Sequence, residues 1–186
     1  MPDISPDFDL IPMTRALMLA LREGDHARAE HELRARIHPA WSLPAEVLEL
    51  RIQQLEANPS WRPWLLQAVV TKREPALIGN VGFHGPPGMH VFEERYPGVV
   101  EIGYDVVPEH RRRGIASRAV AALIEWAAVQ GAATVAITTA ATNVPSRRLA
   151  ERLGFTLIGE EHHPERGPEL LYLSTLDPRH RPSPSR

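Results

Sequence analysis

An arginine-rich turn between a strand and a helix is the first feature of the sequence that could do chemistry. It runs from Val106 to Ala116 as VVPEHRRRGIA, and a helix is expected to begin at Gly114. Such a turn aims several backbone N–H groups at one point, at the positive end of the helix dipole, where an anion binds well. The turn therefore predicts a phosphate or pyrophosphate site. The alternative interpretation is a basic, solvated start of a helix.

Two other phosphate-binding motifs are absent, and the composition excludes further classes. The sequence has neither G-x-x-x-x-G-K-[ST] nor a G-x-G-x-x-G after a strand, which argues against a P-loop NTPase, a kinase or a Rossmann dehydrogenase. Its 23 acidic and 21 basic residues give a formal net charge of −2, unlike a dedicated nucleic-acid binder. It has no cysteine, which excludes disulfides, cysteine-ligated zinc and an acyl-cysteine intermediate.

The elements that must position the turn follow from hydrophobic periodicity and from turn residues. Strands are expected at residues 8–13, 64–71, 76–83, 99–107, 133–139, 155–159 and 170–175. Helices are expected at residues 15–22, 26–36, 114–130 and 145–153, with a further helix opened by Ser42, Pro44 and Glu46. The strands at 64–71 and 76–83 read as an antiparallel hairpin, and residues 84–98 as a long loop of the kind that often carries function.

This order of elements predicts a mixed α/β domain with an antiparallel start and a strand–helix–strand unit after it. We expect one domain over residues 1–176 and a disordered tail over residues 177–186, because the tail is polar and rich in proline. The first residues lack a basic region followed by a long apolar run. The prediction is a cytoplasmic protein with no membrane or nucleic-acid partner.

Three segments carry a resemblance to a known family. Arg111-x-x-Gly114-x-Ala116 fits the [Q/R]-x-x-G-x-[G/A] turn of the GCN5-related N-acetyltransferases (GNAT). Downstream, Asn143-x-x-Ser146 and the later Leu153-Gly154-Phe155 resemble that family's N-x-x-S…L-G-F segment. The residues EIGY, beginning at Glu101, resemble a strand of the branch that includes the ribosomal-protein-alanine acetyltransferases. The resemblance covers about residues 64–175, and the opening elements fit it more loosely.

The resemblance implies a fold and a co-substrate. The fold is a central, mostly antiparallel, twisted sheet with flanking helices and a strand–helix–strand unit that binds acetyl-CoA. The pyrophosphate would lie on the turn that starts at Arg111, against the backbone N–H groups of Arg112, Arg113, Gly114, Ile115 and Ala116. Val106 and Val107 match the strand end that pairs with the pantetheine arm, and an N–H there could stabilise the oxyanion. Asn143, Ser146 and Arg147 match further cofactor contacts. No metal is expected.

Acetyl transfer to an amine requires two proton transfers. An alkyl amine has a pKa of about 10.4, so it must lose a proton before it attacks, and the leaving thiolate then takes one up. Glu101 is the first candidate for the base, acting through water, because glutamates at this distance from the turn are catalytic in relatives. The alternative interpretation is that Glu101 is an exposed residue at the end of a strand with no catalytic role. His84, with its near-neutral pKa range, is the second candidate. The tyrosine that many relatives use as acid would fall at Ala150, so Tyr104, Ser146 or water would replace it.

The expected function is direct acetyl transfer to a primary amine, in a small molecule or at a protein N-terminus. A non-catalytic acyl-CoA sensor is the alternative, and Ala150 favours it. Glu93 and Glu94, with Glu101 and Asp105, could attract a cationic acceptor. His162-His163 is interpreted as a surface turn rather than a metal pair. A homodimer is a candidate assembly, and the sequence leaves the acceptor and the length of the acyl group open.

Overall fold

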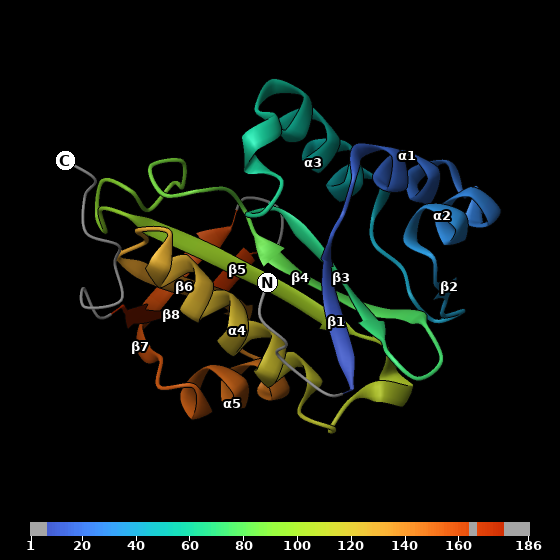
Figure 1. Ribbon diagram of the computed structural model, residues 1–186. Helices are drawn as coiled ribbons and strands as arrows, with labels where there is room; N and C mark the ends of the chain where they lie inside the picture. The colour runs from blue at the N-terminus through green and yellow to red at the C-terminus, as the bar shows by residue number, and fades with distance from the viewer. Residues whose placement is uncertain (1–6, 164–166, 177–186) are drawn as a thin grey trace. The chain divides into compact units, whose positions relative to one another are not determined.

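The computed structural model describes residues 7–163 and 167–176, and the chain forms two compact units (Figure 1). The first unit comprises Met1–Phe83 and Tyr104–Val120, and the second comprises His84–Gly103 and Ala121–Arg186. Strand β5 (Val99–Val106) and helix α4 (Ile115–Val129) each contribute to both units. The expected tail at residues 177–186 lies outside the described residues, and the single domain over residues 1–176 stays a prediction.

The first unit contains an antiparallel sheet with the strand order β1-β3-β4. Its strands are β1 (Phe8–Pro12), β3 (Leu66–Thr71) and β4 (Ala76–Phe83), and the short β2 (Arg36–Ile37) pairs with β4 in parallel. The predicted hairpin of residues 64–71 and 76–83 is confirmed. At the end of β5, the N–H of Val107 donates to the carbonyl of Ile78 at 2.8 Å.

Three helices pack together on one side of this sheet (Figure 1). Helix α1 (Arg15–Glu23) begins after Thr14, whose side chain accepts from the N–H of Leu17, and it ends at Gly24, whose φ is 72°. Helix α2 (His26–Leu33) is shorter than the predicted 26–36, because Arg34 adopts a left-handed conformation with φ 55°. Helix α3 (Ala45–Ala57) has Pro44, not Ser42, at its N-cap. The short helix η1 (Pro59–Trp61) follows it.

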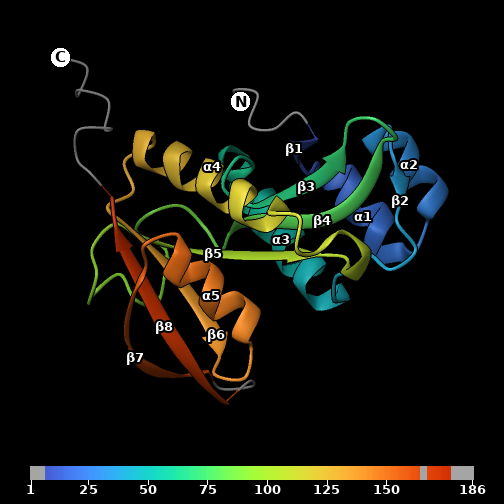
Figure 2. The same ribbon diagram turned by 90° about the horizontal axis from the view of Figure 1, so that it is seen from below.

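The second unit contains the strand order β5-β6-β8-β7. Strands β5 and β6 (Thr134–Ala140) are parallel, while β8 (Gly167–Thr175) is antiparallel to both β6 and β7 (Thr156–His163). Figure 2 shows helix α5 (Val144–Arg152) alongside β6 and β8. The final strand pair is longer than predicted: His162 pairs with Pro168 and His163 with Gly167. The interpretation of His162-His163 as a surface turn was therefore wrong.

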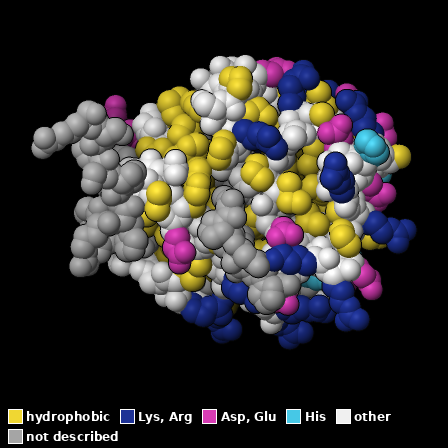
Figure 3. All heavy atoms as spheres, in the orientation of Figure 1, with side chains coloured by type: hydrophobic (Ala, Val, Ile, Leu, Met, Phe, Trp, Pro, Cys, Tyr) yellow, Lys and Arg dark blue, Asp and Glu magenta, His cyan; other side chains and the backbone are white. Residues whose placement is uncertain are grey.

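The predicted fold class, a mixed α/β architecture with a mostly antiparallel sheet and flanking helices, is confirmed. Of the ladders within each unit, β2–β4 and β5–β6 are parallel, while β1–β3, β3–β4, β6–β8 and β7–β8 are antiparallel. No helix in the described part of the chain is long and apolar enough to cross a membrane. Figure 3 shows basic and acidic side chains interspersed on the face in view, as the formal net charge of −2 suggests.

Candidate active site

The predicted loop at residues 84–98 is confirmed, and one glutamate holds it in shape. The two carboxylate oxygens of Glu93 accept from the N–H of Gly98 at 2.7 Å and from the N–H of Gly88 at 3.1 Å. At the start of the loop, the N–H of His84 donates to the carbonyl of Glu101 at 2.9 Å. The loop is therefore fixed on both sides of His90, which lies between these anchors.

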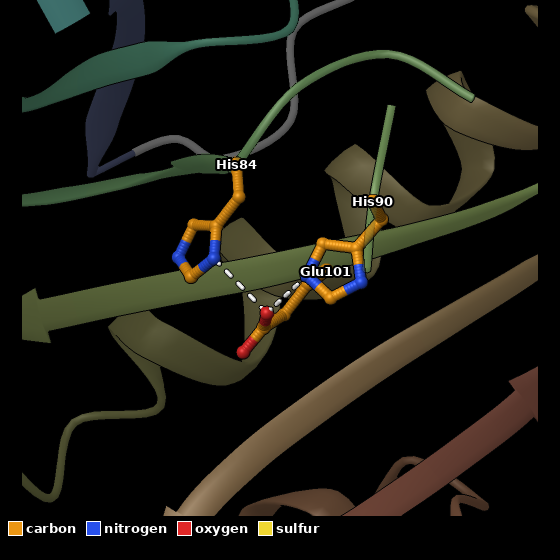
Figure 4. A group of neighbouring side chains, drawn as sticks. All are labelled: His84, His90 and Glu101. Atoms are coloured by element: carbon orange, nitrogen blue, oxygen red, sulfur yellow. Dashed lines mark hydrogen bonds and ion pairs between the residues drawn. The ribbon is translucent and has the colours of Figure 1, made fainter. Parts of the chain in front are cut away.

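Two histidine side chains of the second unit converge on one carboxylate oxygen of Glu101 (Figure 4). Nδ1 of His84 lies 3.0 Å from Oε2 of Glu101, and Nε2 of His90 lies 2.6 Å from the same oxygen. The other oxygen, Oε1, accepts from the hydroxyl of Thr138 on β6. The side chain of Glu101 is 9% exposed, that of His90 12% and that of His84 35%, so His84 is the member that solvent or an acceptor reaches most easily.

The surroundings of Glu101 keep it ionised. Burial raises the pKa of this carboxyl, but the hydrogen bonds from His84, His90 and the hydroxyl of Thr138 lower it more. The net effect holds the pKa of Glu101 well below its usual range. A carboxylate with so low a pKa is a weak proton acceptor, so Glu101 is better suited to orient an imidazole than to remove a proton itself. It is also buried, not the exposed residue of the alternative interpretation.

The hydrogen bonds indicate which ring nitrogen carries the proton in each histidine. Nδ1 of His90 accepts from the N–H of Phe92 at 3.3 Å, which leaves its proton on Nε2, directed at Glu101. Nδ1 of His84 is within hydrogen-bond distance of the ionised Glu101, so it carries the proton and Nε2 carries the lone pair. Nε2 lies beside β5, where a Cβ on Gly103 would come within 3.2 Å of it. Glycine at that position gives the ring room.

The arginine-rich turn lies in the first unit and has the backbone form expected of an anion site. Arg112 and Gly114 both have positive φ, 60° and 74°, just before α4 begins at Ile115. Left-handed residues near a helix start bring successive N–H groups to one side. Before the turn, the short helix η2 (Pro108–His110) leads out of β5.

The side chain of Arg111 folds back onto the end of β5. Its Nε donates to the carbonyl of Val106 at 2.6 Å, and its Nη2 lies 3.2 Å from Oδ1 of Asp105. The N–H of Val107 is already bonded to Ile78. Because alternate N–H groups of a strand point to opposite edges, the N–H of Val106 faces away from β4. Of the two valines, Val106 is therefore the better candidate to meet a cofactor or an oxyanion.

The remaining predicted residues lie at the start of α5 and in β5. Asn143 is the N-cap of α5, and its Oδ1 accepts from the N–H of Ser146 at 3.2 Å. Arg147 donates to the carbonyl of Ala141 at 3.1 Å. Tyr104 follows Glu101 by three positions in β5, and side-chain alternation puts the two on opposite faces of that strand. The structure therefore does not bring Tyr104 into the histidine cluster.

The predicted attraction of these acidic side chains for a cationic acceptor is not favoured by their contacts. Glu93 binds two loop N–H groups, Asp105 pairs with Arg111, and Glu101 is buried among its own partners. Sequence reasoning also missed two members of the cluster, His90 and Thr138. They lie 11 and 37 residues from Glu101, with no motif linking them to it. The position of His90 within the predicted long loop was the one sequence signal that could have suggested a functional role for it.

Comparison with known proteins places the chain in a family. The model described as "Acetyltransferase (GNAT) domain" matches residues 15–156, so the chain belongs to the GNAT family. The uncharacterized N-acetyltransferase YoaA of Bacillus subtilis is 31% identical over 80 residues, which is 42% of this chain and 41% of YoaA. The chain aligns with less than half the length of the curated relatives it matches.

Solved structures support the fold. The microcin C7 self-immunity acetyltransferase MccE, determined with acetyl-CoA and AMP, gives a TM-score of 0.63 at 18% identity, over 95% of this chain and 98% of that one. A ribosomal-protein-S5-alanine acetyltransferase from Vibrio fischeri gives 0.64 at 19% identity, over 93% and 98%. The resemblance to the GNAT fold predicted from the turn, strand and L-G-F segments is thus confirmed.

Proposed function

We propose that the chain is an acetyl-CoA-dependent N-acetyltransferase that moves the acetyl group directly to a primary amine. The observation that carries the proposal is the hydrogen-bonded pair of His84 and the buried Glu101, in a chain of this family. An imidazole held by an ionised carboxylate is a suitable general base near neutral pH. This assignment revises the sequence-based expectation: His84 takes the base role and Glu101 orients it.

The proposed cofactor contacts are mainly backbone N–H groups. The N–H groups of the turn at residues 112–116 would hold the pyrophosphate, with Arg112 and Arg113 adding charge. Val106 would meet the pantetheine arm. Asn143, Ser146 and Arg147 remain proposed contacts. That MccE was solved with acetyl-CoA supports this choice of co-substrate.

The proposed reaction proceeds by deprotonation of the acceptor, attack on the thioester and collapse of the tetrahedral intermediate. Nε2 of His84 takes a proton from the ammonium group of the acceptor, directly or through a water molecule. The free amine then attacks the thioester carbonyl, and the N–H of Val106 stabilises the oxyanion. The attacking nitrogen then gives up its second proton to water, and collapse of the intermediate expels the CoA thiolate, which receives a proton from the imidazolium or from water. Glu101 stabilises the imidazolium in between, as a buried carboxylate does for a catalytic histidine.

The acceptor is proposed as a primary amine of a small molecule or of a protein N-terminus. The Vibrio fischeri neighbour is named for the alanine of a ribosomal protein, which supports keeping the protein N-terminus as an option. The second candidate function is a non-catalytic acyl-CoA sensor. It is favoured by Ala150, which is fully buried in α5 where many relatives have the acid. Because the thiolate is a fair leaving group, water can supply that proton.

Calorimetric titration of acetyl-CoA and CoA into wild type and Gly114→Glu tests the cofactor half of the proposal. Gly24→Glu is the matched control, because both glycines have positive φ (74° and 72°) and neither has an atom within 4 Å of an added Cβ. Each variant should carry a similar backbone strain of about 1–2 kcal/mol. We expect micromolar binding by wild type and Gly24→Glu and none by Gly114→Glu. No binding by wild type, or equal loss in both variants, contradicts the proposal.

A further inference from the structure

Glu101 lacks a permanent positive partner. Its ion pairs in the described ranges, residues 7–163 and 167–176, are with His84 and His90. The carboxylate is buried, and a buried carboxylate is costly without a compensating charge. Neutral imidazoles supply hydrogen bonds but no charge. A cation placed among the three side chains would supply it.

The three side chains are also a suitable set of metal ligands. Two imidazole nitrogens and one carboxylate oxygen bind zinc in many catalytic sites. Here the three ligand atoms lie within 4.8 Å of one another. With bonds of about 2.1 Å, tetrahedral ligand atoms lie about 3.4 Å apart, so each ring must rotate slightly away from Oε2, now 3.0 and 2.6 Å from the two nitrogens, to admit an ion. Figure 4 shows both rings directed at the same carboxylate.

We propose that His84, His90 and Glu101 form a binding site for one divalent ion of the zinc class, such as Zn²⁺ or Co²⁺. Imidazole ligands favour these ions over Mg²⁺ and Ca²⁺, which prefer oxygen. Thr138 supports the site, because its hydroxyl holds the second oxygen of Glu101 as outer partners of metal ligands commonly do. Three protein ligands leave a fourth position for water.

Binding the ion shifts one proton in each ring. The proton on Nδ1 of His84 moves to Nε2, and the proton on Nε2 of His90 moves to Nδ1. The second shift gives up the contact with the N–H of Phe92, which at 3.3 Å is the longest hydrogen bond of the cluster. In the ion-bound form Nε2 of His84 carries a proton. The bound ion and the base role proposed for His84 therefore exclude each other.

The test measures ion binding without acetyl-CoA, so its result does not depend on the proposed function. Zn²⁺ is titrated by calorimetry, and Co²⁺ by visible absorption, into EDTA-treated wild type, His90→Gln, Thr138→Val and His162→Gln. Glutamine keeps an N–H donor for Glu101 but removes the imidazole ligand. His162 is an exposed histidine of β7 and gives the matched control.

We expect one equivalent of ion in wild type and His162→Gln, and binding weakened by about 100-fold or more in His90→Gln. Thr138→Val keeps all three ligands and is expected to weaken binding by about 10- to 100-fold. Unfolding curves confirm that each variant is folded before titration. No uptake by wild type overturns the proposal. Equal uptake by wild type and His90→Gln, or loss in His162→Gln alone, also overturns it, because the ion then lies elsewhere.

Discussion

The hydroxyl of Thr138 is predicted to stabilise the fold through the charge on Glu101. Thr138→Val keeps the shape of the side chain but removes the donor to Oε1 and leaves that oxygen buried without it. A hydrogen bond to a charged group contributes about 1.5–3 kcal/mol. We therefore expect the free energy of unfolding at pH 7 to fall by about that amount. Since one pKa unit corresponds to about 1.36 kcal/mol, the pKa of Glu101 should rise by about 1–2 units.

The pH dependence of this loss identifies its cause. The folded pKa of Glu101 lies below the unfolded value of about 4.3, so its stabilisation is present above that pH and is lost as the pH falls toward the folded value. Wild type and Thr138→Val lose this stabilisation in parallel until the pH reaches the folded pKa of Glu101 in the variant, so the deficit should shrink only below that pH. Urea unfolding of EDTA-treated protein from pH 7 to about pH 1 measures it, with Thr139→Val as the control, because Thr139 points to the opposite face of β6. A deficit that is independent of pH, or equal in Thr139→Val, would refute the reasoning.

Three further predictions concern the sheet, the cofactor and the ion. Gly82→Ala should lower the free energy of unfolding, measured in urea, by about 1–3 kcal/mol, because its Cβ would overlap the carbonyl oxygen of Leu65. Gly159→Ala is the control and should have little effect, because no atom lies within 4 Å of a Cβ added there. Asn143→Asp keeps the N-cap acceptor but loses the amide donor, so the Kd for acetyl-CoA should rise about tenfold while the unfolding midpoint holds. Zn²⁺ should inhibit acetyl transfer, and EDTA should restore the activity. Full activity with the ion bound at His84 would contradict the inference that the bound ion and the base role of His84 exclude each other.

Local signals were sufficient for many of the elements. Thr14 and Gly24 bound α1 as capping residues do, and Asn143 caps α5. The hairpin of β3 and β4 follows from two apolar runs separated by a turn. Periodicity and capping are properties of a few neighbouring residues, so the sequence shows them directly.

The sequence-based predictions were wrong or incomplete where contacts between distant parts of the chain determine the structure. Helix α2 ends at Leu33 because Arg34 adopts a left-handed backbone conformation and Arg36–Ile37 pair with β4. The sequence has no glycine at this position that would have indicated the end of the helix. His162 continues β7 because β8 offers it a partner. The histidine cluster depends on the loop and on the register of β5 and β6, which bring His90 and Thr138 to Glu101. Composition and spacing carry no trace of such long-range contacts.

The most direct test of the account is the rate of acetyl transfer by His84→Asn to an amine that wild type acetylates. The amide nitrogen of asparagine takes the place of Nδ1 and can still donate to Glu101, but no group replaces Nε2 as the proton acceptor. We predict a fall in kcat of about 10²- to 10⁴-fold, with the Kd for acetyl-CoA within about threefold of wild type and His162→Asn unaffected. An unchanged kcat in His84→Asn would contradict the assignment of His84 as the base.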